Sequence, residues 1–177
     1  MSPVIIVLGG DGYLGWPLAL TLALRRPGAR VVIVDNFQRR ELVAEVGGNS
    51  ITPIAGLAAR VAAYRRVSGL DNLEFEILDV ASPALAELIV RRRPEVIYHL
   101  AGASDVGGSW QTPQNTFRAN AEGTLNILWA AREVGVERIL TIGSADVYGR
   151  VTSQDLPISE DLRLAPVSPY AARSEER

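Results

Sequence analysis

The sequence of 177 residues contains no cysteine, no lysine and a single histidine, His99. Without cysteine the chain can form neither disulfides nor thiolate metal sites, and one histidine cannot build a cluster of histidine ligands. A formal net charge of −2 gives no basic field for gathering phosphates, so we expect no nucleic-acid partner. Any anionic ligand must therefore be held by local features of the chain.

Long apolar runs are also missing. No stretch approaches the roughly 20 apolar residues that cross a bilayer, and residues 1–8 lack a basic segment and run directly into glycines. We therefore expect no membrane partner, no signal peptide and a cytoplasmic location, with which the lack of cysteine agrees. The 47% content of hydrophobic residues is enough for a domain with a core.

Short β-branched runs alternate with longer helical patterns along the chain. The expected strands are 4–8, 30–34, 73–78, 96–100 and 138–142, and the expected helices are 14–25, 83–92 (with Ser82 as N-cap) and 113–134. This alternation predicts a parallel sheet with right-handed crossovers. The segment 39–69 is too long for a simple crossover, and Ser50-Ile51-Thr52-Pro53 predicts the start of an additional helix over 54–67.

The first expected strand leads directly into a glycine-rich loop at residues 9–15, followed by a helix. Glycines in that place let the backbone turn tightly and approach a pyrophosphate, and the helix N-terminus stabilises the phosphate charge. Glycines alone would be weak support, but their position between a strand and a helix favours a Rossmann-type doubly wound sheet. The residues expected to contact the cofactor here are Gly9, Gly12, Tyr13, Leu14 and Gly15.

The second strand ends in Asp35-Asn36, about 20 residues after the last glycine, where a carboxylate can accept hydrogen bonds from both ribose hydroxyls. The same carboxylate would repel the 2′-phosphate of NADP, so the pattern favours NAD. Arg39 and Arg40 keep an alternative open, because nearby guanidinium groups could accommodate a 2′-phosphate or a substrate phosphate.

Two more strand ends supply cofactor-binding candidates. At Asp79-Val80 the carboxylate can meet the adenine amino group while the valine packs on the ring, and at Leu100-Ala101-Gly102 small residues let the backbone pass close to the cofactor. Each of these two segments alone is also typical of an ordinary strand-to-loop junction. Their shared position at carboxyl strand ends favours a role in binding. We interpret His99 as a hydrogen-bonded core residue rather than a catalyst.

Hydroxyl groups follow the fifth strand. Ser144 and Asp146 come directly after it, and Ser168-Pro169-Tyr170 predicts the start of a final helix. A serine and a tyrosine that face a nicotinamide could share the proton of a substrate hydroxyl while its hydride leaves. Ser144 and Tyr170 are therefore the predicted catalytic residues.

Over essentially its whole length the chain resembles the extended short-chain dehydrogenases/reductases, in the NAD-dependent epimerase/dehydratase family. Residues 9–16, 34–40 and 50–54 resemble UDP-sulfoquinovose synthases, whereas 109–110, 120–124, 144–149 and 168–170 are more similar to GDP-mannose dehydratases and the related 4-keto reductases. The resemblance implies that Tyr170 takes the proton of a sugar hydroxyl, with Ser144 hydrogen-bonded to that oxygen. Hydride would pass to NAD from a UDP- or GDP-linked sugar.

The chain departs from the family pattern at two places. Dehydratases carry carboxylates just after the serine, where this chain offers only Asp146, so epimerase, dehydratase and reductase chemistry all stay open. The family also has Tyr-x-x-x-Lys, whereas here Ser174 stands four residues after Tyr170 and Arg173 is one residue early. That lysine binds the nicotinamide ribose and lowers the pKa of the tyrosine. A catalytically silent dinucleotide-binding fragment is therefore the alternative function.

We treat residues 1–177 as one NAD-binding domain with an extra helical insertion at about 39–69. Against the family pattern the chain is expected to be truncated on its C-terminal side, without the last strands and the substrate lobe. The Rossmann sheet would then be incomplete and would have an exposed edge. A homodimer stays open as a further assembly.

Overall fold

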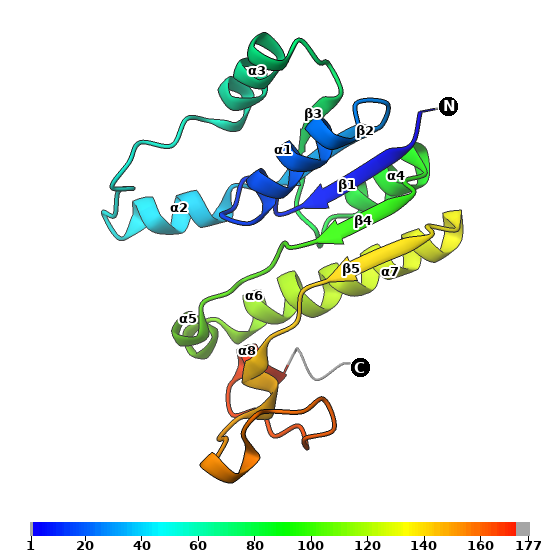
Figure 1. Cartoon of the computed structure of the whole chain (residues 1–177). Coiled ribbons are helices and arrows are strands. Elements are labelled where there is room, and N and C mark those ends of the chain that lie inside the picture. Colours follow the sequence, from blue (N-terminus) through cyan, green and yellow to red (C-terminus); the bar gives the residue numbers. More distant parts are fainter. Residues whose placement is uncertain (1, 173–177) are drawn as a thin grey trace.

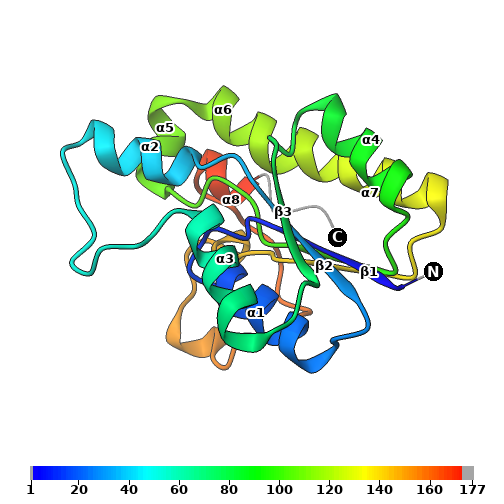
Figure 2. The same cartoon turned by 90° about the horizontal axis from the view of Figure 1, so that it is seen from above.

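The computed structural model describes residues 2–172. It forms a five-stranded parallel sheet with helices on both faces, as Figures 1 and 2 show. In the order β3-β2-β1-β4-β5, the strands are β1 (Val4–Leu8), β2 (Arg30–Asp35), β3 (Leu73–Ile77), β4 (Val96–His99) and β5 (Arg138–Thr141). The predicted Rossmann-type sheet and its five strands are confirmed. The order reverses beside β1, which makes the carboxyl ends of β1 and β4 the switch point.

The central strands β1 and β2 are buried on both faces, and their successive residues serve two separate cores. Figure 2 shows α1 (Gly15–Arg25) and α3 (Leu57–Ser68) on one face, and α4 (Pro83–Arg92) and α7 (Gly123–Val134) on the other. Residues Ile5, Val7, Val31 and Ile33 face the first pair of helices, and Ile6, Leu8, Val32 and Val34 face the second. The β-branched runs therefore read as continuous apolar strands.

Two of the expected helices form largely as predicted. α1 begins at Gly15, one residue after the expected start, and α4 begins after Ser82, whose Oγ accepts a hydrogen bond from the N–H of Ala84 at 3.3 Å. The expected helix at 113–134 is instead divided into α6 (Pro113–Phe117), a π turn η1 (Arg118–Glu122) and α7. Gly135 ends α7 with a φ of +71°.

The prediction for segment 39–69 needs correction. Residues 51–56 are not helical and Ile51 is fully exposed, so Ser50 to Pro53 do not begin a helix. α3 begins only at Leu57, because Leu57, Val61 and Tyr64 form the helical face that reaches the core. A second helix, α2 (Gln38–Glu45), also lies in this segment and was not predicted, since it buries no residue.

The chain after β4 and β5 builds a separate layer at the carboxyl ends of those strands. It contains α5 (Val106–Gln111), the short turns η2 (Ala145–Tyr148) and η3 (Ser153–Asp155), and α8 (Pro169–Ala172), where the final helix was predicted. α8 contacts α5, α6 and η2. Among the residues that the structure describes, no helix has the length and apolar character needed to span a membrane.

Candidate functional site

The glycine-rich loop is folded tightly against the ends of β2 and β4. The N–H of Gly9 donates to the Val34 carbonyl at 2.8 Å, and Gly9 has a φ of +78°. A Cβ at Gly9 would lie 2.7 Å from the backbone nitrogen of Ala101, and one at Gly15 would overlap the Gly9 carbonyl oxygen. The close packing of Gly9 on Ala101, and of Gly15 on the Gly9 carbonyl, therefore requires glycine at these two positions.

The outer side of the loop is open. Tyr13 and Leu14 are 93% and 61% exposed, and Leu14 gives α1 no side-chain cap. Gly12 is exposed as well, with its N–H donating to the Gly9 carbonyl at 3.2 Å. An exposed helix start of this kind suits a phosphate, because the helix dipole favours negative charge there. The contacts predicted for Gly12, Tyr13 and Leu14 with a cofactor stay predictions.

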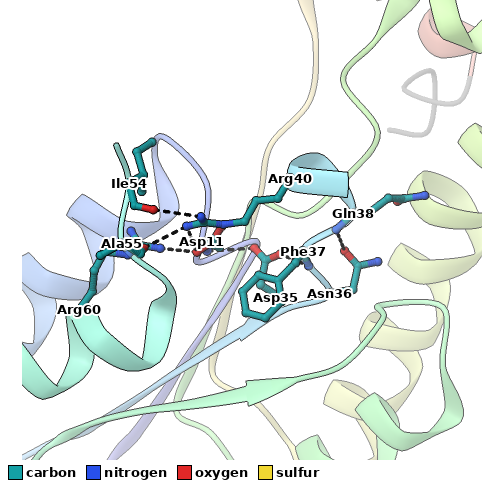
Figure 3. Close-up of polar contacts among 9 residues, drawn as sticks. All are labelled: Asp11, Asp35, Asn36, Phe37, Gln38, Arg40, Ile54, Ala55 and Arg60. Carbon is teal, nitrogen blue, oxygen red and sulfur yellow. Dashed lines mark hydrogen bonds and ion pairs between the residues drawn. The ribbon is translucent and has the colours of Figure 1, made fainter. Parts of the chain in front are cut away.

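Asp35 lies beside this loop, at the carboxyl end of β2 (Figure 3). Its Oδ2 accepts a hydrogen bond from the N–H of Asp11 at 2.9 Å, and its Oδ1 accepts one from the N–H of Phe37 at 2.8 Å. Each carboxylate oxygen can accept a second hydrogen bond. The structure thus fixes Asp35 next to the glycine-rich loop with further acceptor capacity, and its contact with the ribose of NAD stays a prediction.

The ends of β2 and β3 are joined by side chains that the sequence indicated separately. The amide nitrogen of Asn36 donates to Oδ2 of Asp79 at 3.0 Å, and Oδ1 of Asp79 accepts from the N–H of Ala81 at 2.7 Å. Val80 is only 8% exposed, and a Cβ at Gly123 would lie 2.8 Å from its Cγ2. Val80 therefore packs chiefly on α7, and its contact with an adenine ring stays a prediction.

The residues after β4 are held by Asn120, which sequence reasoning did not single out. Its Oδ1 accepts from the N–H of Ala103 at 2.7 Å, and its amide donates to the Ala103 carbonyl at 2.9 Å. A Cβ at Gly102 would lie 2.8 Å from that Oδ1. Residues Leu100-Ala101-Gly102, of which the last two are small, thus run between the glycine-rich loop and η1. The only sequence signal for Asn120 was its place in the motif 120–124.

His99 is a hydrogen-bonded core residue, as predicted. It is 3% exposed, its Nε2 lies 2.9 Å from Oγ1 of Thr124, and that hydroxyl donates to the Asn120 carbonyl at 2.6 Å. Because the threonine proton is used on the carbonyl, this geometry favours the tautomer that carries its proton on Nε2. His99 therefore connects the end of β4 to α7.

The predicted catalytic residues lie on neighbouring elements. Ser144 begins η2, and its Oγ accepts from the N–H of Asp146 at 3.2 Å. Tyr170 lies in α8, which contacts η2, and its N–H donates to Oγ of Ser109 at 3.3 Å. Their joint action on one substrate oxygen stays a prediction. The positions Arg173 and Ser174 lie outside the described residues.

Comparisons with known proteins agree with this architecture. Residues 5–174 match the family described as the NAD dependent epimerase/dehydratase family. The chain belongs to this family. The cofactor predicted from the sequence, NAD, is thereby confirmed for the family.

Similar proteins include UDP-glucose 4-epimerase 2 of Oryza sativa subsp. japonica, 30% identical over 94% of this chain and 36% of that protein. The UDP-sulfoquinovose synthase of Sulfolobus acidocaldarius is 34% identical over 88% of the chain and 40% of its own length. A UDP-glucose-4-epimerase from Stenotrophomonas maltophila, solved with bound NAD and formylated UDP-arabinopyranose, gives a TM-score of 0.74 at 25% identity, covering 97% of this chain and 45% of that one. The chain thus spans less than half the length of these proteins.

This family member carries a charge cluster that sequence reasoning did not assemble. We call Asp11, Arg40 and Arg60 the Asp11 cluster. Nε and Nη2 of Arg40 bind the two Asp11 oxygens at 2.5 and 3.0 Å, and Arg60 also binds Oδ1 of Asp11 (Figure 3). The hydrogen bond with Asp11 raises the pKa of Arg40, whereas burial lowers the pKa of Arg60. Arg60 comes from α3, far from the loop in sequence, and only its position on that helix brings it here.

Proposed function

We propose that this chain binds NAD across the carboxyl ends of β1, β2 and β4. The observation that carries this proposal is the hydrogen bond of 2.9 Å between the Asp11 N–H and Asp35, which couples the phosphate loop to the ribose acceptor. The pyrophosphate would lie on residues 9–15 at the start of α1, and the adenosine ribose on Asp35. The adenine would lie beside the hydrogen-bonded Asn36–Asp79 pair, at the ends of β2 and β3.

The nicotinamide half would extend past Leu100 to Gly102 toward η2 and α8. When bound, NAD supplies a two-electron oxidant for a sugar hydroxyl. The phenol oxygen of Tyr170 would take the hydroxyl proton, and Ser144 would hold the same oxygen by a hydrogen bond. With that proton removed, the carbon-bound hydrogen would leave with its electron pair and the alcohol would become a ketone, NAD being the hydride acceptor.

The substrate class that we propose is a nucleotide sugar. The relatives at 30% and 34% identity are a UDP-glucose epimerase and a UDP-sulfoquinovose synthase, which favours a UDP-linked sugar over a GDP-linked one. An epimerase requires a reversible oxidation at one carbon, which is the hydride step described above. We therefore propose nucleotide-sugar 4-epimerisation as the reaction type.

One sequence observation favours a second candidate, NAD binding without turnover. Ser174 stands where the family has lysine, and a serine brings no positive charge to the tyrosine. The positive charge with which the family activates this tyrosine is then absent, which favours binding without turnover. Binding of the adenosine half of NAD does not depend on this position.

Calorimetric titration with NAD, followed by an assay for the conversion of UDP-glucose into its 4-epimer, tests both candidates. We expect saturable NAD binding that Asp35→Ala weakens by about tenfold or more, because two hydrogen bonds to ribose are lost. Asp161→Ala, which removes an exposed carboxylate to which we assign no contact with NAD, should bind as the unmodified chain does. Binding with no conversion would favour the second candidate, and an absence of NAD binding would refute both.

We also propose that α7 pairs with a second copy of the chain. Its outer side carries Leu125 and Trp129, which are 61% and 65% exposed, and Phe117 on α6 is 55% exposed. Leu125 and Trp129 are four residues apart and so share one helical face. Exposed apolar side chains gathered in this way are typical of a protein–protein interface.

A further inference from the structure

The Asp11 cluster lies within hydrogen-bond reach of the residue that we assign to the ribose. We infer that Asp11 determines the preference for NAD over NADP, because it holds Arg40 and Arg60 away from the 2′-position beside Asp35. This inference rests on the proposed function, the binding of a dinucleotide at Asp35. It answers the question left open by the sequence, in which an arginine after β2 could serve either cofactor.

Arg40 has its three guanidinium nitrogens engaged. Nε and Nη2 form a two-pronged contact with the Asp11 carboxylate, and the same Nη2 donates to the Ala55 carbonyl at 3.2 Å. Nη1 donates to the Ile54 carbonyl at 3.3 Å (Figure 3). Paired contacts of this geometry are among the stronger hydrogen bonds in proteins. These bonds occupy four of the five N–H donors of Arg40, so a 2′-phosphate could form a two-pronged contact with Arg40 only by breaking its contact with Asp11.

Arg60 is held more firmly still. Its side chain is 14% exposed, its guanidinium carbon lies 4.4 Å from the ring centre of Trp16, and an Nη2 bond ties it to Asp11. Its Nε is buried without a hydrogen-bond partner. Burial lowers the pKa of Arg60, and the negative charge of Asp11 opposes this shift. The Asp11 carboxylate is therefore the group that stabilises the buried cation.

The charges explain the consequence for a ligand. Asp11 and Asp35 balance Arg40 and Arg60, so the four side chains together are neutral. A ribose hydroxyl would meet the Asp35 carboxylate, whereas a 2′-phosphate would meet the same negative charge while Arg40 and Arg60 are paired with Asp11. Removal of the Asp11 charge would leave the group with a net positive charge and two arginines released from their carboxylate, which is the environment that favours a phosphate.

The Asp11→Asn variant tests this inference, because asparagine keeps the size of the side chain and the backbone N–H that binds Asp35. Binding of NAD and NADP is measured by calorimetry. We expect the affinity for NADP to rise about tenfold, with a change in NAD affinity of less than about threefold. The double variant Asp11→Asn/Arg40→Gln should lose most of the gain in NADP affinity. A purely structural role of Asp11 would instead weaken both ligands together.

Arg40→Gln in the otherwise unmodified chain provides a second test, which does not depend on whether the Asp11→Asn variant folds. Because Arg40 is engaged by Asp11, we expect the NADP affinity to stay within about twofold, as for the control Arg91→Gln, which changes an exposed arginine in the last turn of α4. A loss of NADP affinity of about fivefold or more with Arg40→Gln would overturn the inference, as would an unchanged NADP-to-NAD ratio in Asp11→Asn. If the unmodified chain bound no NAD, the proposed function itself would fall as well.

Discussion

At the scale of single residues, two glycines shape the loop for different reasons. Gly9 needs its positive φ and its close approach to Ala101, whereas Gly15 needs space, because a Cβ there would overlap the Gly9 carbonyl. The contact at Gly15 joins the first turn of α1 to the loop that precedes it. A side chain at this position must therefore separate the helix from the loop.

We predict that Gly15→Ala lowers NAD affinity by at least about tenfold and the free energy of unfolding by about 1–3 kcal/mol, since overpacking forces the backbone to shift. Gly28→Ala is the matched control, because a Cβ at Gly28 meets nothing within 4 Å. It should change stability by no more than about 0.5 kcal/mol. Calorimetry and chemical denaturation of the two variants make the comparison, and equal NAD affinity in both would contradict the prediction.

Single residues also show where sequence reasoning works. Asp35 was predicted beside the glycine-rich loop, because a fixed offset in a strand–helix–strand unit determines that neighbourhood. Arg60 was not predicted, because 49 residues and a non-helical segment separate it from Asp11. Nothing in the local pattern at 57–68 distinguishes this arginine from Arg65 or Arg66, which the same helix directs elsewhere. Such contacts depend on the rotation of a helix, which the sequence pattern specifies only roughly.

At the scale of elements, Asn72 holds three of them together at the amino end of the sheet. Its amide donates to the carbonyls of Ala23 and Ala29 at 3.0 Å each, and its Oδ1 accepts from the hydroxyl of Tyr64 at 2.6 Å. These partners belong to α1, to the residue before β2, and to α3. Asn72 itself is 7% exposed. Loss of one partner would therefore leave buried polar groups without a hydrogen bond.

We predict that Tyr64→Phe lowers the free energy of unfolding by about 1–2 kcal/mol and Asn72→Ala by about 2–3 kcal/mol, through these unsatisfied groups. The double variant should cost less than the sum, because both changes remove the same bond. Urea denaturation measures all three variants. Tyr13→Phe, whose hydroxyl is in solvent, serves as the control and should be neutral. Strict additivity would show that the two residues act independently.

The elements themselves were predicted unequally. Strand positions followed from β-branched runs that are apolar on both faces, and α4 followed from Ser82 and Pro83 at its start. α2 escaped prediction because no apolar stripe marks a helix that buries nothing, and α3 was started too early because a serine and a proline also occur in exposed connections. Capping residues mark a helix start only where a buried face follows at helical spacing.

At the scale of the whole molecule, α7 has two apolar sides. One side packs Ile127, Ala130 and Ala131 on the sheet, and the other exposes Leu125 and Trp129. A helix that serves one chain alone usually has charged residues on its outer face. The family assignment and the parallel sheet were both predicted from the sequence, whereas this exposed side was not, because periodicity cannot show which of two apolar sides is covered.

We predict that Trp129→Glu converts a dimer of this chain into a monomer, because a charge would be buried between two copies of α7. Size-exclusion chromatography with light scattering gives the mass of each form. Leu24→Glu, a change at a half-exposed position on α1 across the sheet, is the control and should leave the mass unchanged. A monomeric unmodified chain at high concentration would contradict the proposed pairing.

The π turn at 118–122 has a consequence for how members of the family can differ in length. A π turn holds one residue more than the α-helical turn it replaces, so deletion of one residue there would rotate α6 against α7 by about 100°. Asn120 would no longer reach Ala103. The helix α8, which carries Tyr170, would lose its packing surface on α5 and α6. A relative with a one-residue gap at this point of an alignment would thus have a differently arranged candidate site at the carboxyl ends of β4 and β5, even if it keeps every residue of that site.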